Sequence, residues 1–126
     1  MLSLYAALAC FTLPPQGATF TGSTMGVFVN AQLVGHDPRG VQAVAFIRMR
    51  GGMLGGSGHI DGYATVNYKG DVFASPKLRA ALSKRYMRID HLVDEHDHDS
   101  EGVPKRVAVV VDTPVLGRIR VNLKRV

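Results

Sequence analysis

TMGVFVNAQLV, residues 24–34, and VQAVAFIRMR, residues 41–50, are the stretches that decide the fold of this chain. Both are rich in β-branched and aromatic residues that favour strands, and residues 35–40 between them, GHDPRG, are typical of a turn. The pattern predicts a β-hairpin with a loop of about six residues. Apolar side chains occupy both alternating sets of positions in residues 41–50, so we expect that strand to be covered on both faces.

Three later stretches also predict strands. Residues 59–69, HIDGYATVNYK, alternate between apolar and polar positions, which indicates a half-buried strand. Residues 105–112, KRVAVVVD, indicate a buried strand, and residues 115–126 alternate again. The side chains expected to face inward are Ile60, Gly62, Ala64, Val66 and Tyr68 in the first stretch, and Ile119, Val121 and Leu123 in the last.

One helix is expected among these strands. Ser75 is a suitable N-cap, and Pro76 suits the first helical position, where a missing N–H is no loss. Apolar residues then recur at helical spacing, which predicts an amphipathic helix as far as about residue 91 or 93. Its expected buried stripe is Leu78, Ala81, Leu82, Ile89 and Leu92 or Val93. The chain is therefore predicted to be an α+β domain, with an antiparallel β-rich sheet of about five or six strands packed against one amphipathic helix.

The charged residues are distributed unevenly along the chain. The first 36 residues contain no Asp, Glu, Lys or Arg, whereas the rest of the chain holds all 15 basic and 10 acidic residues. A stretch this long without charge is expected to avoid water. Because residues 14–17, PPQG, break regular structure, we expect an apolar N-terminal arm over residues 1–17 and a single α+β domain over residues 18–126.

An apolar arm suggests a function in assembly. Exposed on a monomer it is an aggregation hazard, but a neighbouring subunit can bury it or accept it as an added strand. We therefore expect a non-enzymatic structural or assembly subunit, in a homo-oligomer or with other assembly subunits. The glycine-rich, β-rich composition with an apolar arm is similar in style to small virion or phage head and tail proteins. The expected interface residues are Leu2, Leu4, Tyr5, Leu8, Phe11, Leu13 and Phe20.

Size and cysteine content limit the class of protein. A chain of 126 residues with 46% hydrophobic content can bury an ordinary core as one domain. Cys10, the single cysteine, cannot form an internal disulfide, which favours a reducing compartment. Residues 7–9 before it are similar to a lipoprotein cleavage site, but no basic residue precedes them and the apolar run is too short to span a bilayer. We expect a protein of the cytoplasm or of an assembled virion, not secreted and with no membrane span.

Residues 94–101, DEHDHDSE, hold five of the ten acids. Asp97, Asp99 and Glu101 place oxygen ligands at alternate positions, which partly matches the start of a calcium loop. Such a loop needs a Glu at its twelfth position, and counting from Asp97 there is none. His96 and His98 could instead bind zinc, with His91 as a third ligand. A solvated loop and a pH-responsive histidine cluster are the alternatives. A divalent metal, the one cofactor considered, would make the chain a metal-binding enzyme or sensor, and its candidate ligands are His96, Asp97, His98, Asp99 and Glu101.

Basic residues dominate outside this acidic segment, and they suggest a small basic nucleic-acid-binding domain as an alternative function. Arg48 and Arg50 could contribute, and Tyr63 and Tyr86 are candidates for stacking on bases. Simple compensation between the acidic loop and the basic helix is the competing interpretation. The candidate residues are Lys77, Lys84 and Arg88 on the predicted helix and Arg118, Arg120 and Lys124 on the last strand.

Sequence motifs for catalysis are missing. No serine lies in a G-x-S-x-G elbow, and residues 51–58, GGMLGGSG, match neither a P-loop nor a dinucleotide-binding fingerprint. Cys10 lies in the apolar arm, where a thiolate is disfavoured. His59 and Asp61 could form an acid–base pair, but two polar residues on one face are also usual for a half-exposed strand. We therefore expect no enzymatic activity.

Overall fold

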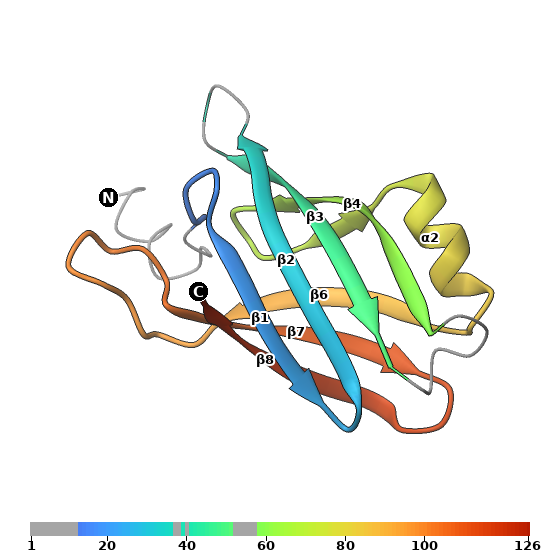
Figure 1. Cartoon of the computed structure of the whole chain (residues 1–126). Coiled ribbons are helices and arrows are strands. Elements are labelled where there is room, and N and C mark those ends of the chain that lie inside the picture. Colours follow the sequence, from blue (N-terminus) through green and yellow to red (C-terminus); the bar gives the residue numbers. More distant parts are fainter. Residues whose placement is uncertain (1–12, 37–38, 40, 52–57) are drawn as a thin grey trace.

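The computed structural model describes residues 13–36, 39, 41–51 and 58–126. In these ranges the chain forms eight strands and one short helix (Figure 1). The elements are β1 (Thr19–Thr24), β2 (Val27–His36), β3 (Gln42–Arg50), β4 (His59–Asn67), β5 (Val72–Ala74), α2 (Pro76–Ser83), β6 (Arg88–Asp94), β7 (Arg106–Thr113) and β8 (Gly117–Arg125).

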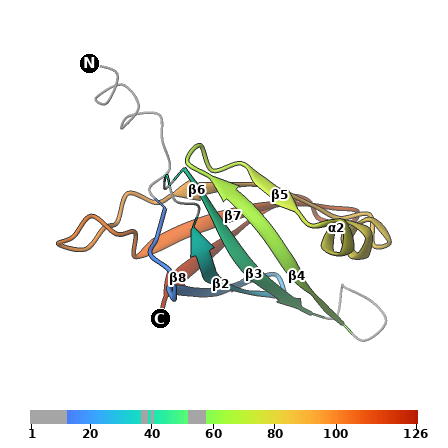
Figure 2. The same ribbon diagram turned by 90° about the horizontal axis from the view of Figure 1, so that it is seen from above.

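All eight strands belong to one antiparallel sheet that curls into a nearly closed barrel. Their order is β5-β4-β3-β2-β1-β8-β7-β6, so that the first and last of the described strands, β1 and β8, lie side by side (Figures 1 and 2). The two ends of the sheet meet where Asp71, next to β5, forms a bridge with His91 of β6. The N–H of Leu92 donates to the carbonyl oxygen of Gly70 at 2.8 Å across the same seam.

The predicted α+β arrangement is therefore wrong. The sheet covers its own apolar face by curving around it, so the core does not need a helix as a second layer. Helix α2 lies at one end of the barrel instead (Figure 2). Its Leu78 and Leu82 are buried, and Leu78 lies directly against Gly62 of β4. A Cβ atom at Gly62 would stand 2.8 Å from the Cβ of Leu78, so only glycine allows the helix to approach this closely.

The helix begins as predicted but ends about ten residues early. The Ser75 side chain accepts a hydrogen bond from the N–H of Leu78, and Pro76 occupies the first turn. After Ser83 the chain reverses through Tyr86, whose φ is +56°, and β6 follows. Ile89 and Leu92 share a face although they are three residues apart, because the β6–β7 register shifts between Ile89 and His91. A β-bulge thus produces the spacing that resembles a helix.

The predicted hairpin at residues 24–50 is confirmed, but its first strand begins later than expected. Met25 and Gly26 have φ values of +52° and +80° and form a tight turn between β1 and β2. Positive φ at both central residues is what a two-residue hairpin of type I′ requires. The predicted strand at residues 24–34 therefore spans the end of β1, the turn and most of β2.

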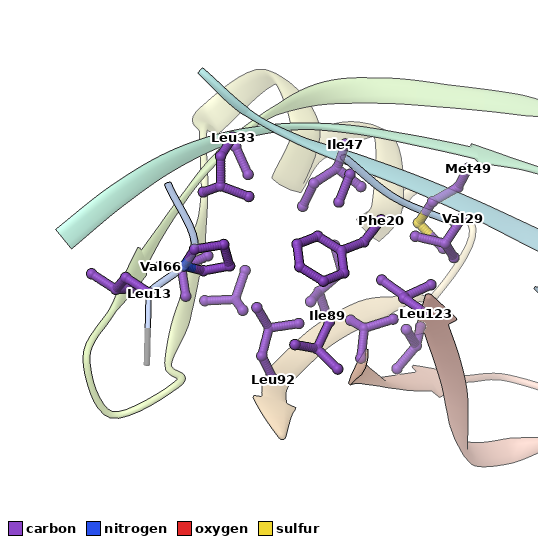
Figure 3. Close-up of a pocket in the computed structure, with 17 residues that line it drawn as sticks. Leu13, Phe20, Val29, Leu33, Ile47, Met49, Val66, Ile89, Leu92 and Leu123 are labelled. Atoms are coloured by element: carbon purple, nitrogen blue, oxygen red, sulfur yellow. The ribbon is translucent and has the colours of Figure 1, made fainter. Parts of the chain in front are cut away.

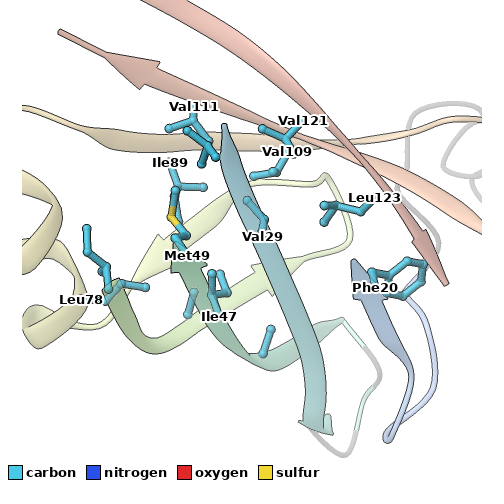
Figure 4. Packing of buried hydrophobic residues seen from close by; sticks show 14 of the residues in the cluster. Phe20, Val29, Ile47, Met49, Leu78, Ile89, Val109, Val111, Val121 and Leu123 are labelled. Carbon is cyan, nitrogen blue, oxygen red and sulfur yellow. The ribbon is translucent and has the colours of Figure 1, made fainter. Parts of the chain in front are cut away.

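The barrel interior is a continuous apolar cluster to which all strands except β5 contribute buried side chains (Figure 4). The predicted inward positions of β8 and β4 are confirmed, except that Tyr68 follows β4 and is 39% exposed. In β3 only one face is buried, because a barrel has a single interior. Val44 and Phe46 point outward, which corrects the expectation that this strand is covered on both faces.

Candidate functional site

Most of the predicted arm interface lies outside the described residues. This holds for Leu2, Leu4, Tyr5, Leu8 and Phe11. Of the remaining two, Leu13 is partly buried against the core cluster, and Phe20 is 2% exposed inside the barrel. Phe20 therefore belongs to the barrel's own core. The carbonyl oxygen of Pro14 also lies 2.6 Å from Nε2 of His36, which ties the start of the described chain to the end of β2.

A small cavity lies in the barrel interior, with Leu13, Phe20 and Leu92 among the residues around it (Figure 3). Its volume is about 40 Å³, and every side chain that lines it is apolar. A dry cavity of about 150 Å³ is needed to hold a molecule such as benzene. The cavity is therefore a packing gap in the core and offers neither the volume nor the polar groups of a ligand site.

The acidic segment does not bring its candidate metal ligands together. Asp94 lies 2.8 Å from Nε2 of His98, while Asp97 and Asp99 face Arg106 and Arg125. Two backbone N–H groups also donate to Asp99, and the bond from Val103 is the main reason that the pKa of Asp99 is lowered. His96 and Glu101 are exposed. Within the described ranges, no group of three or more His, Cys, Asp or Glu side chains converges as a metal site.

Three of the predicted nucleic-acid-binding residues are held in ion pairs on the outer face of β6, β7 and β8. Arg88 and Arg118 both contact Asp112 at 2.9 Å, and Arg120 contacts Glu95 at 2.7 Å. Hydrogen bonds from Arg118, and then from Arg88, lower the pKa of Asp112. The same pairing raises the pKa of Arg118. The predicted basic helix face does not form either, because Arg88 lies on β6, while Lys77, Lys84 and Lys124 are exposed at separate positions.

Exposed aromatic side chains gather instead on the outer face of β3, β4 and β5. Phe46 and Tyr63 are opposite each other in the β3–β4 register, with ring centroids 5.0 Å apart in an edge-on arrangement. The next outward row crosses the same three strands at Val44, Thr65 and Phe73. Tyr63 and Phe73 are each 54% exposed. We call these five residues the aromatic patch.

A hollow lies beside the aromatic patch on the outer face of β1–β4. Two rows of paired residues cross these strands, Thr21–Asn30–Arg48–Asp61 and Ser23–Phe28–Arg50–His59. Except for Asp61, these side chains line an open hollow of about 670 Å³, within the usual size of a ligand site. Gly22 and Val29 also line it, and we call the hollow formed with the side chains of Thr21, Ser23, Phe28, Asn30, Arg48, Arg50 and His59 the arginine hollow.

The arginine hollow combines cationic and aromatic groups. The guanidinium carbon of Arg50 lies 5.8 Å from the ring centroid of Phe28, and that of Arg48 lies 5.3 Å from Phe46. Both distances are within the range of cation–π attraction. Nε2 of His59 lies 2.8 Å from the carboxylate of Asp61. The hollow therefore presents two positive charges, an exposed ring and several hydrogen-bonding groups to solvent.

Most of this surface is not predictable from the sequence, because its residues come from four different strands. The alternation of Phe46, Arg48 and Arg50 along one strand face was a usable signal, since residues two apart lie on the same side. Phe28 was not identifiable as exposed without knowing that the turn at Met25 sets the phase of β2. The alignment of these two strands with β1 depends on the barrel itself.

Comparisons with protein-family models, curated proteins and solved structures found no match. Function is therefore argued from the chemistry of the surface, because a fold alone does not determine it. In the part of the chain that the structure describes, no helix is both long and apolar enough to cross a membrane.

Proposed function

We propose that this protein is a non-enzymatic assembly subunit whose copies associate through the aromatic patch. The observation that supports the proposal is the lack of charge on this part of the sheet. The outward positions Gln32, Phe46 and Tyr63 form one row, and Val44, Thr65 and Phe73 form the next. None of them is charged, in a chain of which 20% is charged. Exposed apolar surface of this kind is typical of protein interaction sites.

A second copy of the chain is the partner that fits this surface best. The protein carries a formal net charge of +5, so two copies repel each other unless they meet where neither is charged. An uncharged patch is self-complementary, which a two-fold symmetric contact requires. Two sheets can pack face to face about 10 Å apart with their outward side chains interleaved. Tyr63 and Phe73 would be the central anchors of such a contact, since aromatic residues dominate interface energetics.

The uncharged N-terminal arm is the second contact in this proposal. Leu13 is the residue of the arm that the structure describes before the prolines, and it is partly buried against the barrel core. In this proposal a neighbouring subunit accepts the arm as an added strand. Cys10 forms no internal disulfide, which is consistent with assembly in the cytoplasm or in a virion or phage particle.

Light scattering on a sizing column tests the patch contact. We expect the wild-type chain to form oligomers whose mass rises with concentration and persists in high salt, because burial of apolar surface does not depend on ionic attraction. The double variant Tyr63→Glu/Phe73→Glu should elute as a monomer. The matched control is Tyr86→Glu/Val115→Glu, which adds the same two charges at side chains that are 83% and 84% exposed elsewhere. Circular dichroism verifies that each variant is folded.

The result that contradicts the proposal is a wild-type monomer at all concentrations, or an oligomer that survives Tyr63→Glu/Phe73→Glu. The full-length variant Leu4→Glu/Leu8→Glu examines the arm separately. A smaller oligomer for this variant, with the patch intact, would show that the two contacts act independently. No change in mass would remove the arm from the proposal and leave the patch in it.

A further inference from the structure

The arginine hollow has no acidic side chain among the residues that line it. Asp61 is the acid that stands next to it in the strand register, opposite Arg48, but its carboxylate contacts Nε2 of His59. Arg48 and Arg50 form no ion pair within the described ranges, and each guanidinium lies over an aromatic ring instead. Neither guanidinium of the hollow is therefore in direct contact with an acid in the part of the chain that the structure describes.

Elsewhere on the barrel, arginines are paired with acids. Arg88, Arg118 and Arg120 contact Asp112 or Glu95, and the same holds for Arg106 with Asp97 and Arg125 with Asp99. Compensation of that kind removes most of the attraction for an external anion. Among the arginines on the described strands, Arg48 and Arg50 are therefore the two without an ion pair. Their guanidinium groups remain available to an anionic ligand.

We propose that the arginine hollow binds single-stranded nucleic acid, with phosphate groups at Arg48 and Arg50 and a base stacked on Phe28. The proposal does not depend on the assembly function. Guanidinium groups form strong charge-assisted hydrogen bonds with phosphate oxygens. Phe28 is 52% exposed, so part of its ring stays open to a base although the Arg50 guanidinium lies over it.

The spacing of these groups fits an extended strand of nucleotides. Arg48 and Arg50 are two residues apart on one strand face, which separates their Cα atoms by about 6.6 Å. Phe28 lies beside Arg50 on the neighbouring strand β2. Hydroxyl and amide groups of Thr21, Ser23 and Asn30 continue both rows toward β1. A ligand that lies across the hollow can therefore contact charge, ring and hydrogen-bonding groups at the same time.

Stacking on Phe28 is the reason for a preference for single strands. Bases of a duplex are stacked within the helix, and only its phosphates and groove edges are offered to an exposed ring. Unpaired bases can lie flat on an aromatic side chain, which contributes comparably for every base. The hollow should therefore show little sequence preference and a clear preference for single strands over duplex of the same length.

Fluorescence anisotropy with labelled oligothymidylate and oligouridylate, at several salt concentrations, tests the site in the full-length protein. A plot of log affinity against log salt concentration has a negative slope, to which each phosphate contact with a single strand contributes about 0.7. We expect Arg48→Ala/Arg50→Ala to make this slope shallower by about 1.4. Phe28→Ala should weaken binding about tenfold with an unchanged slope, because stacking is not ionic. The control Lys77→Ala/Lys124→Ala removes the same charge at exposed positions outside the hollow and should change neither quantity by as much.

Three results would overturn the proposal. The first is wild-type affinity that is equal for single-stranded and duplex DNA, which would remove the role of Phe28. The second is a larger loss in the lysine control than in Arg48→Ala/Arg50→Ala, which would place the contact on the helix and β8. The third is displacement of the oligonucleotide by an equimolar amount of a nucleoside monophosphate, which would indicate a pocket for free nucleotides. All substituted side chains are exposed, and circular dichroism provides the check on folding.

Discussion

The closure of the barrel depends on Gly22, and Gly22→Ala should show this most directly. In β1, a Cβ atom at this position would point at the backbone of β8. It would lie 2.9 Å from the carbonyl carbon of Asn122, 3.1 Å from the Cα of Leu123, and closer still to the carbonyl oxygen of Asn122. Carbon atoms that are not bonded to each other normally stay about 3.5 Å apart. The two backbones must therefore separate by at least roughly 0.6 Å, since 3.5 exceeds 2.9 by that amount.

A separation of this size is enough to damage the β1–β8 seam. Register pairs join these strands at Phe20 and Thr21, and the N–H of Val126 donates to the carbonyl oxygen of Thr19 at 2.9 Å. Adding the displacement stretches such a bond to about 3.5 Å, beyond the usual range. Losing two bonds costs about 2 kcal/mol, and strain in a well-packed barrel adds about 1 to 2 kcal/mol. We expect Gly22→Ala to lower the free energy of unfolding by about 3 to 4 kcal/mol.

Urea unfolding followed by far-ultraviolet circular dichroism measures this quantity, since the chain has no tryptophan to serve as a fluorescent probe. Gly35→Ala is the matched control, because a Cβ atom there has no neighbour within 4 Å and its φ lies outside the left-handed region. We expect the control to be neutral or up to about 1 kcal/mol more stable, as the unfolded chain loses freedom. The reasoning is refuted if the two variants unfold with free energies within about 0.5 kcal/mol of each other.

Two further predictions concern the helix start and the ion pairs. Ser75→Ala should cost about 1 kcal/mol in urea unfolding, because the N–H of Leu78 loses its acceptor, whereas Ser83→Ala at the other end of the helix should cost less; equal losses would contradict a capping role. Hydrogen bonds from Arg118 and Arg88 lower the pKa of Asp112 in the folded state, so they stabilise the fold when Asp112 is ionised. This stabilisation is fully present above the unfolded pKa of about 3.9 and is lost as pH falls through the folded pKa. Asp112→Asn should therefore flatten the fall of Tm with acidification below about pH 4, and thermal melts that fall in parallel for both proteins would argue against it.

Elements with local signals were predictable from the sequence. Strict alternation identified β4 and β8, and the chemistry of Ser75 and Pro76 identified the start of α2. Each of these signals depends on residues that are close together in the chain, so a window of about ten residues contains all the information. The same is true of the turn between β7 and β8, where the Thr113 hydroxyl accepts from the N–H of Leu116 and donates to the Gly117 carbonyl oxygen.

Other elements were not predictable because their cause is not local. The bulge at Ile89–His91 gives β6 the apolar spacing of a helix, and the chain reversal at Tyr86 uses a residue that rarely adopts positive φ. Barrel closure joins residues near opposite ends of the sequence, which no window can detect. Glycine at position 22 was a sign of close backbone approach, but a single glycine does not identify its neighbour.

The candidate surface follows from how the barrel distributes charge rather than from the total charge of the chain. Acids of the segment after β6, together with Asp90 and Asp112, neutralise the arginines of β6, β7 and β8. That side of the barrel therefore carries little uncompensated charge despite its density of ionised groups. The outer face of β1–β5 has fewer charged residues, yet Arg48 and Arg50 form no ion pair there within the described ranges. A negatively charged ligand is attracted by basic side chains that have no acidic partner. The stronger anion site is therefore expected at the arginine hollow, although basic residues are fewer on that side of the barrel.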